Sequence, residues 1–258
     1  MPLLDPRHLP AYRAQQHVLL DDRLAAITEE RNGGSADLVN LYESAVASSQ
    51  IEGSKVTLSI FKATMETAGN EPKPRDVQEV ADLVTAYQFA QQHPLKSANL
   101  LEAHRIASAL LVHANDQGAW RSKGVKVGNA VTTVYMAAHQ SLVPKLMEEL
   151  MAETDALLQR KLDTTEAFYY ASLLHFAFVK VHPFIDGNGR MGRLLEKWFL
   201  AQHIGPIAWS IRSERFYIRN LDDYYDTLAA TGPDWGILQW DLCVPFLLLL
   251  PQALVLNR

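Results

Sequence analysis

Residues 182–193 of this chain read His182-Pro183-Phe184-Ile185-Asp186-Gly187-Asn188-Gly189-Arg190-Met191-Gly192-Arg193. An apolar run leads up to this stretch and ends at Val181, and apolar residues recur after it at helical spacing from Leu194 to Phe199. The stretch is therefore predicted to be a loop between two buried helices. Its glycine-rich end would form the N-terminus of the second helix.

The glycines and arginines of this loop suit an anionic ligand. Gly187 and Gly189 lack the Cβ atom that would keep the backbone away from a ligand, and unpaired N–H groups at a helix start form an anion site. Arg190 and Arg193 occupy neighbouring positions of one helix, and each offers a planar fork of donors to phosphate oxygens.

The same loop carries a candidate metal ligand and a candidate base. Asp186 supplies a hard oxygen of the type that magnesium takes beside phosphates. His182 is the side chain here that can accept a proton near neutral pH without special tuning. Together these residues predict phosphoryl or nucleotidyl transfer from a magnesium-bound nucleotide. The alternative is a glycine-rich turn with a helix cap and exposed arginines.

The stretch matches throughout the signature HxFx(D/E)GNGRxxR, so the chain resembles the Fic family. Members of that family are mostly helical enzymes that typically transfer AMP from ATP to a hydroxyl side chain of a target protein. The likeness extends more loosely over residues 35–240. It implies an all-α, Fic-type helical bundle with one small β-hairpin flap, and it implies ATP and Mg²⁺ as cofactors.

The resemblance also implies a role for each residue of the signature. His182 would be the general base that takes the proton of the target hydroxyl, and Asp186 would hold Mg²⁺. Arg190 would bind the β phosphate and Arg193 the γ phosphate. The predicted nucleotide-binding residues of the signature are Gly187, Asn188, Gly189, Arg190, Met191, Gly192 and Arg193.

A second motif lies upstream, on a helix predicted over about residues 35–53. Gly53 suits the end of this helix, which places Glu52 in the last turn, where a negative charge opposes the helix dipole. Many such glutamates are simply solvated. Ser48-x-x-x-Glu52-Gly53, however, is similar to the inhibitory motif (S/T)xxxE(G/N) of autoinhibited Fic proteins, in which the glutamate pairs with the arginine that matches Arg193.

Residues from about 120 to 136 interrupt the helical pattern. Valines and threonines flank Gly128-Asn129-Ala130, which predicts a β-hairpin. The hairpin resembles the flap of Fic proteins, which covers the active site and holds the target segment by strand addition. The candidate target-binding residues are Val127, Gly128 and Asn129. The alternative is an exposed structural hairpin, and its end and register are left open because Met136-Ala137-Ala138 departs from the proline-rich exit of many relatives.

Tyr224 and Tyr225 are candidates for the base of the nucleotide. They lie in a segment similar to the YYxxL stretch that lines the adenine pocket in Fic proteins. Aromatic pairs on a helix are as often part of the core, so both interpretations stay open.

The expected helices divide the chain at about residue 95. Residues 1–95 are predicted to form an N-terminal helical region that carries the inhibitory helix. Residues 96–258 are predicted to form the Fic catalytic core, with the flap and C-terminal packing helices. Single helices are expected over residues 11–31, 99–113 and 164–181, the last of which leads into the signature.

Composition restricts the remaining possibilities. The chain has 258 residues, of which 48% are hydrophobic, and a net charge of −5 argues against a general nucleic-acid binder. Cys243 is the only cysteine, so no disulfide can form within the chain. No signal peptide is evident, and the apolar run near the C-terminus is too short and interrupted for a membrane span. We expect a cytoplasmic protein with no nucleic-acid or membrane partner.

The sequence leaves other functions open. One is removal of AMP from a modified protein, in which Glu52 would orient the attacking water. Another is a regulatory nucleotide-binding module without turnover, against which the intact His182 and Asp186 count. The partner is expected to be a protein substrate that docks on the flap, and the enzyme itself is an expected acceptor. Homodimers are common among Fic proteins, so the resemblance implies a homodimer as a further assembly, although no stretch of this sequence proves one.

Overall fold

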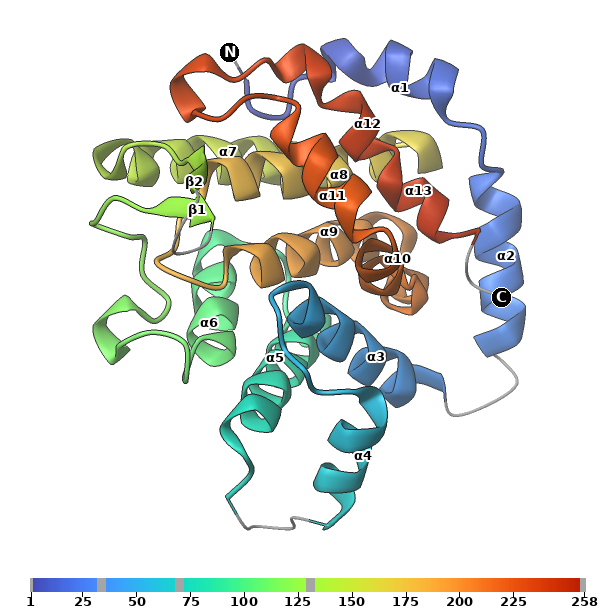
Figure 1. Ribbon diagram of the computed structural model, residues 1–258. Coiled ribbons are helices and arrows are strands. Elements are labelled where there is room, and N and C mark those ends of the chain that lie inside the picture. Colours follow the sequence, from blue (N-terminus) through green and yellow to red (C-terminus); the bar gives the residue numbers. More distant parts are fainter. Residues whose placement is uncertain (1, 32–35, 68–71, 129–132, 256–258) are drawn as a thin grey trace.

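The computed structural model describes residues 2–31, 36–67, 72–128 and 133–255. As the sequence predicts, the fold is all-α apart from one two-stranded sheet (Figure 1). The helices are α1 Leu9–Gln15, α2 Leu20–Arg31, α3 Ala36–Ile51, α4 Leu58–Thr67, α5 Arg75–Gln92, α6 Ser97–Ala107, α7 Val143–Leu158, α8 Thr164–Val181, α9 Asn188–Ile204, α10 Ser213–Arg219, α11 Leu221–Ala229, α12 Val244–Leu247 and α13 Leu249–Ala253.

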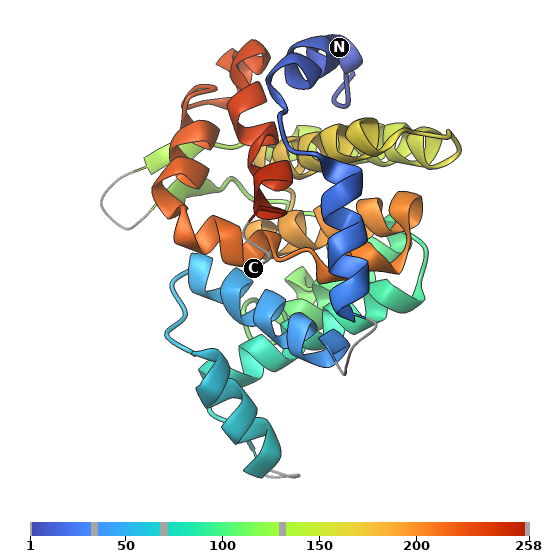
Figure 2. The same cartoon turned by 90° about the vertical axis from the view of Figure 1, so that its right-hand side faces the viewer.

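Helices α8 and α9 form the centre of the molecule, and α1, α2, α3, α5, α7, α12 and α13 pack against one or both of them (Figures 1 and 2). α8 begins at a capping box, in which Asp163 and Glu166 each accept a hydrogen bond from the other's backbone N–H. Almost all of its residues are buried, which is why the predicted apolar run shows no polar face. The expected bounds 164–181 are confirmed. The loop of residues 182–187 therefore starts and ends in the core.

Gly192 of α9 allows the two central helices to approach each other. A Cβ atom at this position would lie 2.7 Å from Cδ2 of His175 and 2.8 Å from Cγ1 of Val179, both on α8. The side of Gly192 where a Cβ would project therefore faces α8, which makes it a helix-packing residue.

We expect Gly192→Ala to lower the free energy of unfolding by about 1–3 kcal/mol, because the added methyl group overpacks this contact. Urea unfolding would measure the change. Gly124→Ala is the matched control, since its Cβ would meet only Oε1 of Gln140, at the ordinary distance of 3.5 Å. Equal stability of the two variants would contradict the role of Gly192 in packing.

The N-terminal segment packs against α8 and against the C-terminal helix α12. α1 contacts α12, and the Tyr169 hydroxyl of α8 donates to the carbonyl oxygen of Asp5 at 2.6 Å. α3 packs against α5, α9 and α10, whereas α4 projects away from the body (Figures 1 and 2). The buried apolar residues form one cluster from Leu3 to Leu254, and the division at residue 95 stays a prediction.

Two predicted helices are shorter than expected. The helix expected over residues 11–31 is broken between α1 and α2, where Gln16 is extended and its side-chain amide donates to the carbonyl oxygen of Val18. The helix expected to reach residue 113 ends at Ala107, and the Gln117 amide donates to carbonyl oxygens of the turn that follows. The carbonyl oxygens at these breaks accept hydrogen bonds from side-chain amides. They therefore do not need the backbone N–H groups of a longer helix as donors.

The sheet consists of β1 Lys126–Gly128 and β2 Thr133–Met136, which pair antiparallel. The predicted hairpin is therefore confirmed. Val127 lies opposite Tyr135, and the register shifts between Val127 and Gly128. Within the ranges given above, no helix has both the length and the hydropathy needed to cross a membrane.

Candidate active site

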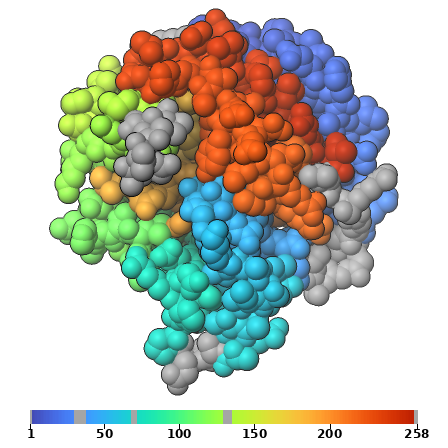
Figure 3. Space-filling view, in the orientation of Figure 1, coloured from blue at the N-terminus to red at the C-terminus, as the bar shows by residue number. Residues whose placement is uncertain are grey.

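A cavity of about 580 Å³ lies between the hairpin, α8, α9, α11 and the C-terminal end of α3. Its wall includes His182, Gly189 and Arg193 of the central loop and helix, together with Glu52 and Tyr225. On the face seen in Figure 3, the blue segment that contains the end of α3 lies directly beside the orange C-terminal segment. The cavity thus collects residues from distant parts of the sequence.

His182 is the C-cap of α8 and has a left-handed backbone conformation, with φ 54°. Its Nδ1 lies 3.2 Å from the carbonyl oxygen of Val179. A carbonyl oxygen only accepts, so Nδ1 carries the proton and Nε2 keeps its lone pair. Burial lowers the pKa of His182 to about 4, so the imidazole is neutral at pH 7. The residue can therefore accept a proton at Nε2.

Arg121, which the sequence analysis did not single out, holds this conformation in place. Its buried guanidinium donates to the carbonyl oxygen of His182 at 2.7 Å and to that of Val181 at 3.3 Å. It also donates to the carbonyl oxygens of Lys123 and Ala138, on either side of the hairpin. Arg121 thus ties the end of α8 to the base of the hairpin.

Gly187 begins α9 with a φ of 81°, which a side chain would disfavour. The Asn188 amide accepts from the backbone N–H of Phe184 at 2.8 Å and donates to its carbonyl oxygen at 2.9 Å. These bonds fix the loop. The backbone N–H groups of the first turn of α9 are then the groups available to an anion.

His104 of α6 contacts the loop of residues 182–187. Its Nδ1 accepts from the backbone N–H of Gly118 at 2.9 Å, so its Nε2 carries the proton and donates to the carbonyl oxygen of Asp186 at 3.1 Å. Its ring stacks on Phe184, with centroids 3.5 Å apart. Burial lowers the pKa of His104 to about 4, which keeps it neutral. His104 is therefore a packed histidine that contacts the loop through its ring and through Nε2.

Arg193 is completely buried and is bonded to α3. Nε donates to the Ser48 hydroxyl at 2.9 Å, and Nη2 donates to the Ser48 carbonyl oxygen at 2.9 Å and to Oε1 of Glu52 at 2.7 Å. Burial by itself would lower the pKa of Arg193, but Tyr224 and Glu52 raise it, so the guanidinium stays charged. The structure therefore brings the three residues of the two predicted motifs into contact.

Glu52 lies directly over the start of α9. A Cβ atom on Gly189 would be 2.2 Å from Oε1 of Glu52, so the carboxylate fills space that a side chain would otherwise occupy. Glu52 follows the last residue of α3 and is held by a Schellman motif, in which Gly53 has a φ of 94° and Ser54 donates to the carbonyl oxygen of Ser49. The backbone at the end of α3 thus points the carboxylate into the cavity.

Known proteins with similar sequences share this part of the chain. Residues 94–200 match the profile of the Fic/DOC family. A Fido domain-containing protein of Dictyostelium discoideum is 36% identical over 114 residues, which make up 40% of this chain and 79% of that protein. The chain belongs to the Fic/DOC family.

Other Fic proteins resemble longer parts of the chain. Protein adenylyltransferase Fic of Nematostella vectensis is 31% identical over 157 residues, or 57% of this chain, which spans only 34% of that protein. A crystal structure of a Fic family protein from Desulfovibrio desulfuricans superposes with a TM-score of 0.74 at 26% identity, covering 91% of this chain and 70% of that one. The predicted Fic fold is confirmed.

Three other residues of the Fic signature lie away from the cavity wall. Met191 is completely buried and Gly192 packs on α8, so both have a packing role, and their predicted contact with the nucleotide stays a prediction. Arg190 is also buried, but its Nε and Nη1 have no hydrogen-bond partner in the part of the chain that the structure describes. A buried guanidinium without acceptors fits an anionic ligand.

Asp186 of the Fic signature is exposed, and its Oδ1 accepts from the backbone N–H of Gly187 at 2.6 Å. Among the described residues, no three His, Cys, Asp or Glu side chains cluster as a metal site. Magnesium is often held by one or two carboxylates together with substrate phosphates. A single carboxylate beside a helix N-terminus fits that manner of binding.

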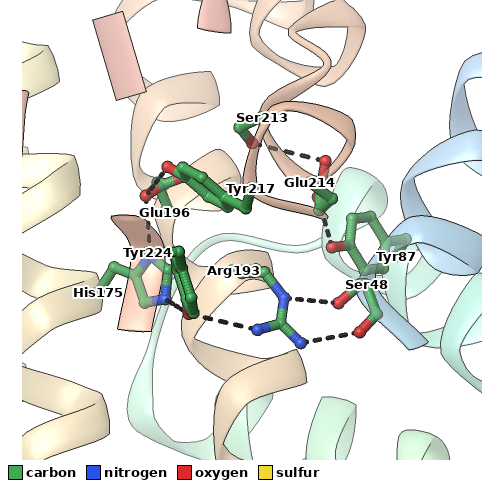
Figure 4. A network of polar contacts seen from close by, with 9 residues as sticks. All are labelled: Ser48, Tyr87, His175, Arg193, Glu196, Ser213, Glu214, Tyr217 and Tyr224. Carbon is green, nitrogen blue, oxygen red and sulfur yellow. Dashed lines mark hydrogen bonds and ion pairs between the residues drawn. The ribbon is translucent and has the colours of Figure 1, made fainter. Parts of the chain in front are cut away.

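The two tyrosines of α11 have different surroundings. Tyr225 is 44% exposed, and its hydroxyl donates to the carbonyl oxygen of Ile51 at the end of α3 at 3.1 Å. Tyr224 is 2% exposed, and its hydroxyl lies among polar groups of the core (Figure 4). Both line the cavity, but only Tyr225 presents an accessible ring.

Lys180, another residue that the sequence analysis missed, joins the Fic flap to the body. Its Nζ donates to the carbonyl oxygen of Leu228 at 2.8 Å and lies 4.3 Å from the ring centroid of Tyr135 on β2. The Tyr135 hydroxyl donates to the Lys180 carbonyl oxygen at 2.9 Å. Burial lowers the pKa of Lys180 to about 8. A lysine inside an apolar run was the signal available in the sequence.

Two of the three predicted target-binding residues lie on the flap, beside the cavity. Val127 and Gly128 belong to β1 and line the cavity. Asn129, the third predicted residue, lies outside the residues that the structure describes.

Proposed function

We propose that the chain is a protein adenylyltransferase, which transfers AMP from ATP to a hydroxyl side chain of a target protein and is held inactive by Glu52. The observation that carries this proposal is that His182, Gly189 and Arg193 line one cavity, in which the carboxylate of Glu52 lies on Arg193. The named relative from Nematostella vectensis is an adenylyltransferase, which supports the same reaction here.

Each residue has a chemical role in this reaction. Nε2 of His182 takes the proton of the target hydroxyl. The oxygen of that hydroxyl attacks the α phosphorus of ATP, and pyrophosphate leaves. Arg190, Arg193 and the N–H groups at the start of α9 bind the phosphates and hold them in line. Asp186 would hold Mg²⁺, which when bound offsets the negative charge of the phosphates.

The flap supplies the surface for the protein substrate. Among the described residues β1 pairs only with β2, and the end of β2, at Met136, also pairs with the segment at Pro233 and Asp234. The outer edge of β1 can therefore accept an extended segment of the target by strand addition. Such a segment would pass beside the cavity, because Val127 and Gly128 line it.

Asp186→Ala is expected to lower AMP transfer strongly and to make the remaining rate insensitive to magnesium, because the phosphate charge is no longer offset. Labelling of target with ATP across a magnesium titration measures both effects. Asp155→Ala, which removes an exposed carboxylate on α7, is the matched control and should keep the response of the parent protein. A normal rate with a normal magnesium response in Asp186→Ala would assign the ion to other groups.

Removal of AMP from a modified protein is the alternative reaction. It is favoured by one observation, the position of the Glu52 carboxylate over Gly189 inside the cavity, where it could orient a water for attack on the phosphodiester. A regulatory module without turnover would need neither the free Nε2 of His182 nor Asp186. Self-modification, a homodimer and a cytoplasmic location rest on the sequence alone and remain part of the proposal.

A further inference from the structure

The hydroxyl of Tyr224 contacts Arg193, the residue that is proposed to bind the terminal phosphate. Its oxygen lies 3.3 Å from Nη1 of Arg193 and 3.1 Å from Nε2 of His175 (Figure 4). Arg193 is completely buried and Tyr224 nearly so, so both contacts lie in the interior of the protein. The sequence predicts an adenine contact for Tyr224, whereas this geometry points to the phosphate end of the cavity.

Glu196 fixes which groups donate and which accept in the hydrogen bonds that join His175, Tyr224 and Arg193. His175 Nδ1, at 2.8 Å, and the Tyr217 hydroxyl, at 2.9 Å, both bond to its buried carboxylate, which accepts from them. The proton of His175 is then on Nδ1, so Nε2 accepts from the Tyr224 hydroxyl. The oxygen of Tyr224 is left to accept from Arg193.

Tyr224 holds Arg193 from the side opposite to the inhibitory helix. In the described part of the chain, the Arg193 guanidinium donates its other hydrogen bonds to Ser48 and Glu52, at the end of α3. Glu52 must leave for a phosphate to bind to Arg193. The contact from Tyr224 does not depend on α3 and would persist.

We propose that Tyr224, oriented by His175 and Glu196, is a positioning residue that fixes the Arg193 guanidinium for the terminal phosphate of ATP whether or not Glu52 is bound. This inference rests on the proposed function, in which Arg193 binds the γ phosphate. It assigns the adenine side of the cavity to Tyr225 and the phosphate side to Tyr224.

Calorimetric titration with ATP and with AMP tests the proposal in the Glu52→Gly protein, in which Arg193 no longer pairs with a carboxylate at the end of α3. Tyr224→Phe should weaken ATP binding about tenfold and leave AMP binding unchanged, because AMP lacks the terminal phosphate. Arg193→Ala should weaken ATP binding by about 10- to 100-fold. The double variant should bind ATP no more weakly than Arg193→Ala alone, since Tyr224 acts through Arg193.

The other outcomes overturn the proposal. Equal losses of ATP and AMP affinity in Tyr224→Phe would show a direct contact with the base. Losses that multiply in the double variant would show that Tyr224 acts independently of Arg193, and unchanged affinity would show no positioning at all. If the Glu52→Gly protein itself binds neither nucleotide, it is the proposed function that fails, so the two failures are distinguishable.

Two further variants control for stability. Tyr169→Phe removes a hydroxyl from the far end of α8 and should leave both affinities unchanged. His175→Phe combined with Glu196→Met replaces the pair behind Tyr224 without leaving a buried charge unpaired. This variant touches no nucleotide group and should reproduce the selective loss of ATP affinity, which also decides the matter if Tyr224→Phe does not fold.

Discussion

Glu52→Gly is expected to raise the rate of AMP transfer about 100-fold, onto target proteins and onto the enzyme itself. The carboxylate takes the Nη2 donor of Arg193 and covers Gly189, so ATP that enters the cavity has its phosphates displaced. A displacement of about 1 Å can cost on the order of 100-fold in rate. Mass spectrometry of proteins incubated with ATP and magnesium measures the transfer.

Two variants test whether Glu52 acts through Arg193. Glu52→Gln removes the charge but keeps an oxygen that can accept from Arg193, so its rate should lie between those of the parent and Glu52→Gly. Arg193→Ala should not activate, because it leaves the terminal phosphate without its partner. The double variant should be as slow as Arg193→Ala alone, which is the non-additivity expected of residues in contact.

The same experiment separates transfer from removal of AMP. If Glu52→Gly leaves the transfer rate unchanged, Glu52 is not inhibitory. If the substitution instead abolishes the loss of AMP from a modified target, removal is the reaction that the site performs, and Glu52 takes part in it.

His182→Ala is expected to lower AMP transfer by roughly 10²–10⁴-fold in the Glu52→Gly background, while ATP binding stays nearly unchanged. The free lone pair on Nε2 is lost, whereas the phosphate contacts come from α9. Binding is measured by calorimetry and transfer by mass spectrometry. Undiminished transfer would remove His182 from the mechanism.

The left-handed backbone at His182 calls for a control. Alanine tolerates a φ of 54° poorly, so a loss in His182→Ala could reflect a moved loop. Asparagine is more tolerant of this conformation, and it offers no base of suitable pKa. His182→Asn should therefore lose as much activity as His182→Ala; a nearly active His182→Asn would indicate that the histidine matters for the loop and not for proton transfer.

Several features of the site followed from local sequence. The apolar run before His182 and the glycines after it predict a loop between two buried helices, because helix periodicity and the freedom of glycine act over a few residues. The end of α3 was predictable for the same reason, since Gly53 permits the Schellman motif that fixes Glu52. The hairpin was predictable from its valines and threonines, although its register was not.

Other features are absent from any local pattern. The break between α1 and α2 arises where the chain changes the elements against which it packs, and intrinsic helix preference does not record such a change. In the sequence, His104 looks like an ordinary helix residue and Arg121 like an ordinary loop residue. Their roles come from backbone carbonyl groups of the loop that only the packed structure brings to them.

The sequence by itself determined which residues could do the chemistry: a histidine, a carboxylate and two arginines at the start of one helix. The resemblance to Fic proteins already implied that Glu52 meets Arg193, 141 residues away, and the tertiary structure shows this contact. Only the tertiary structure decided that Tyr224 meets the same guanidinium from the other side. The physical reason is that α3 is placed by its packing against α5, α9 and α10, and α11 by its packing against α10 and α12. The polar residues at their edges meet as a consequence of that packing.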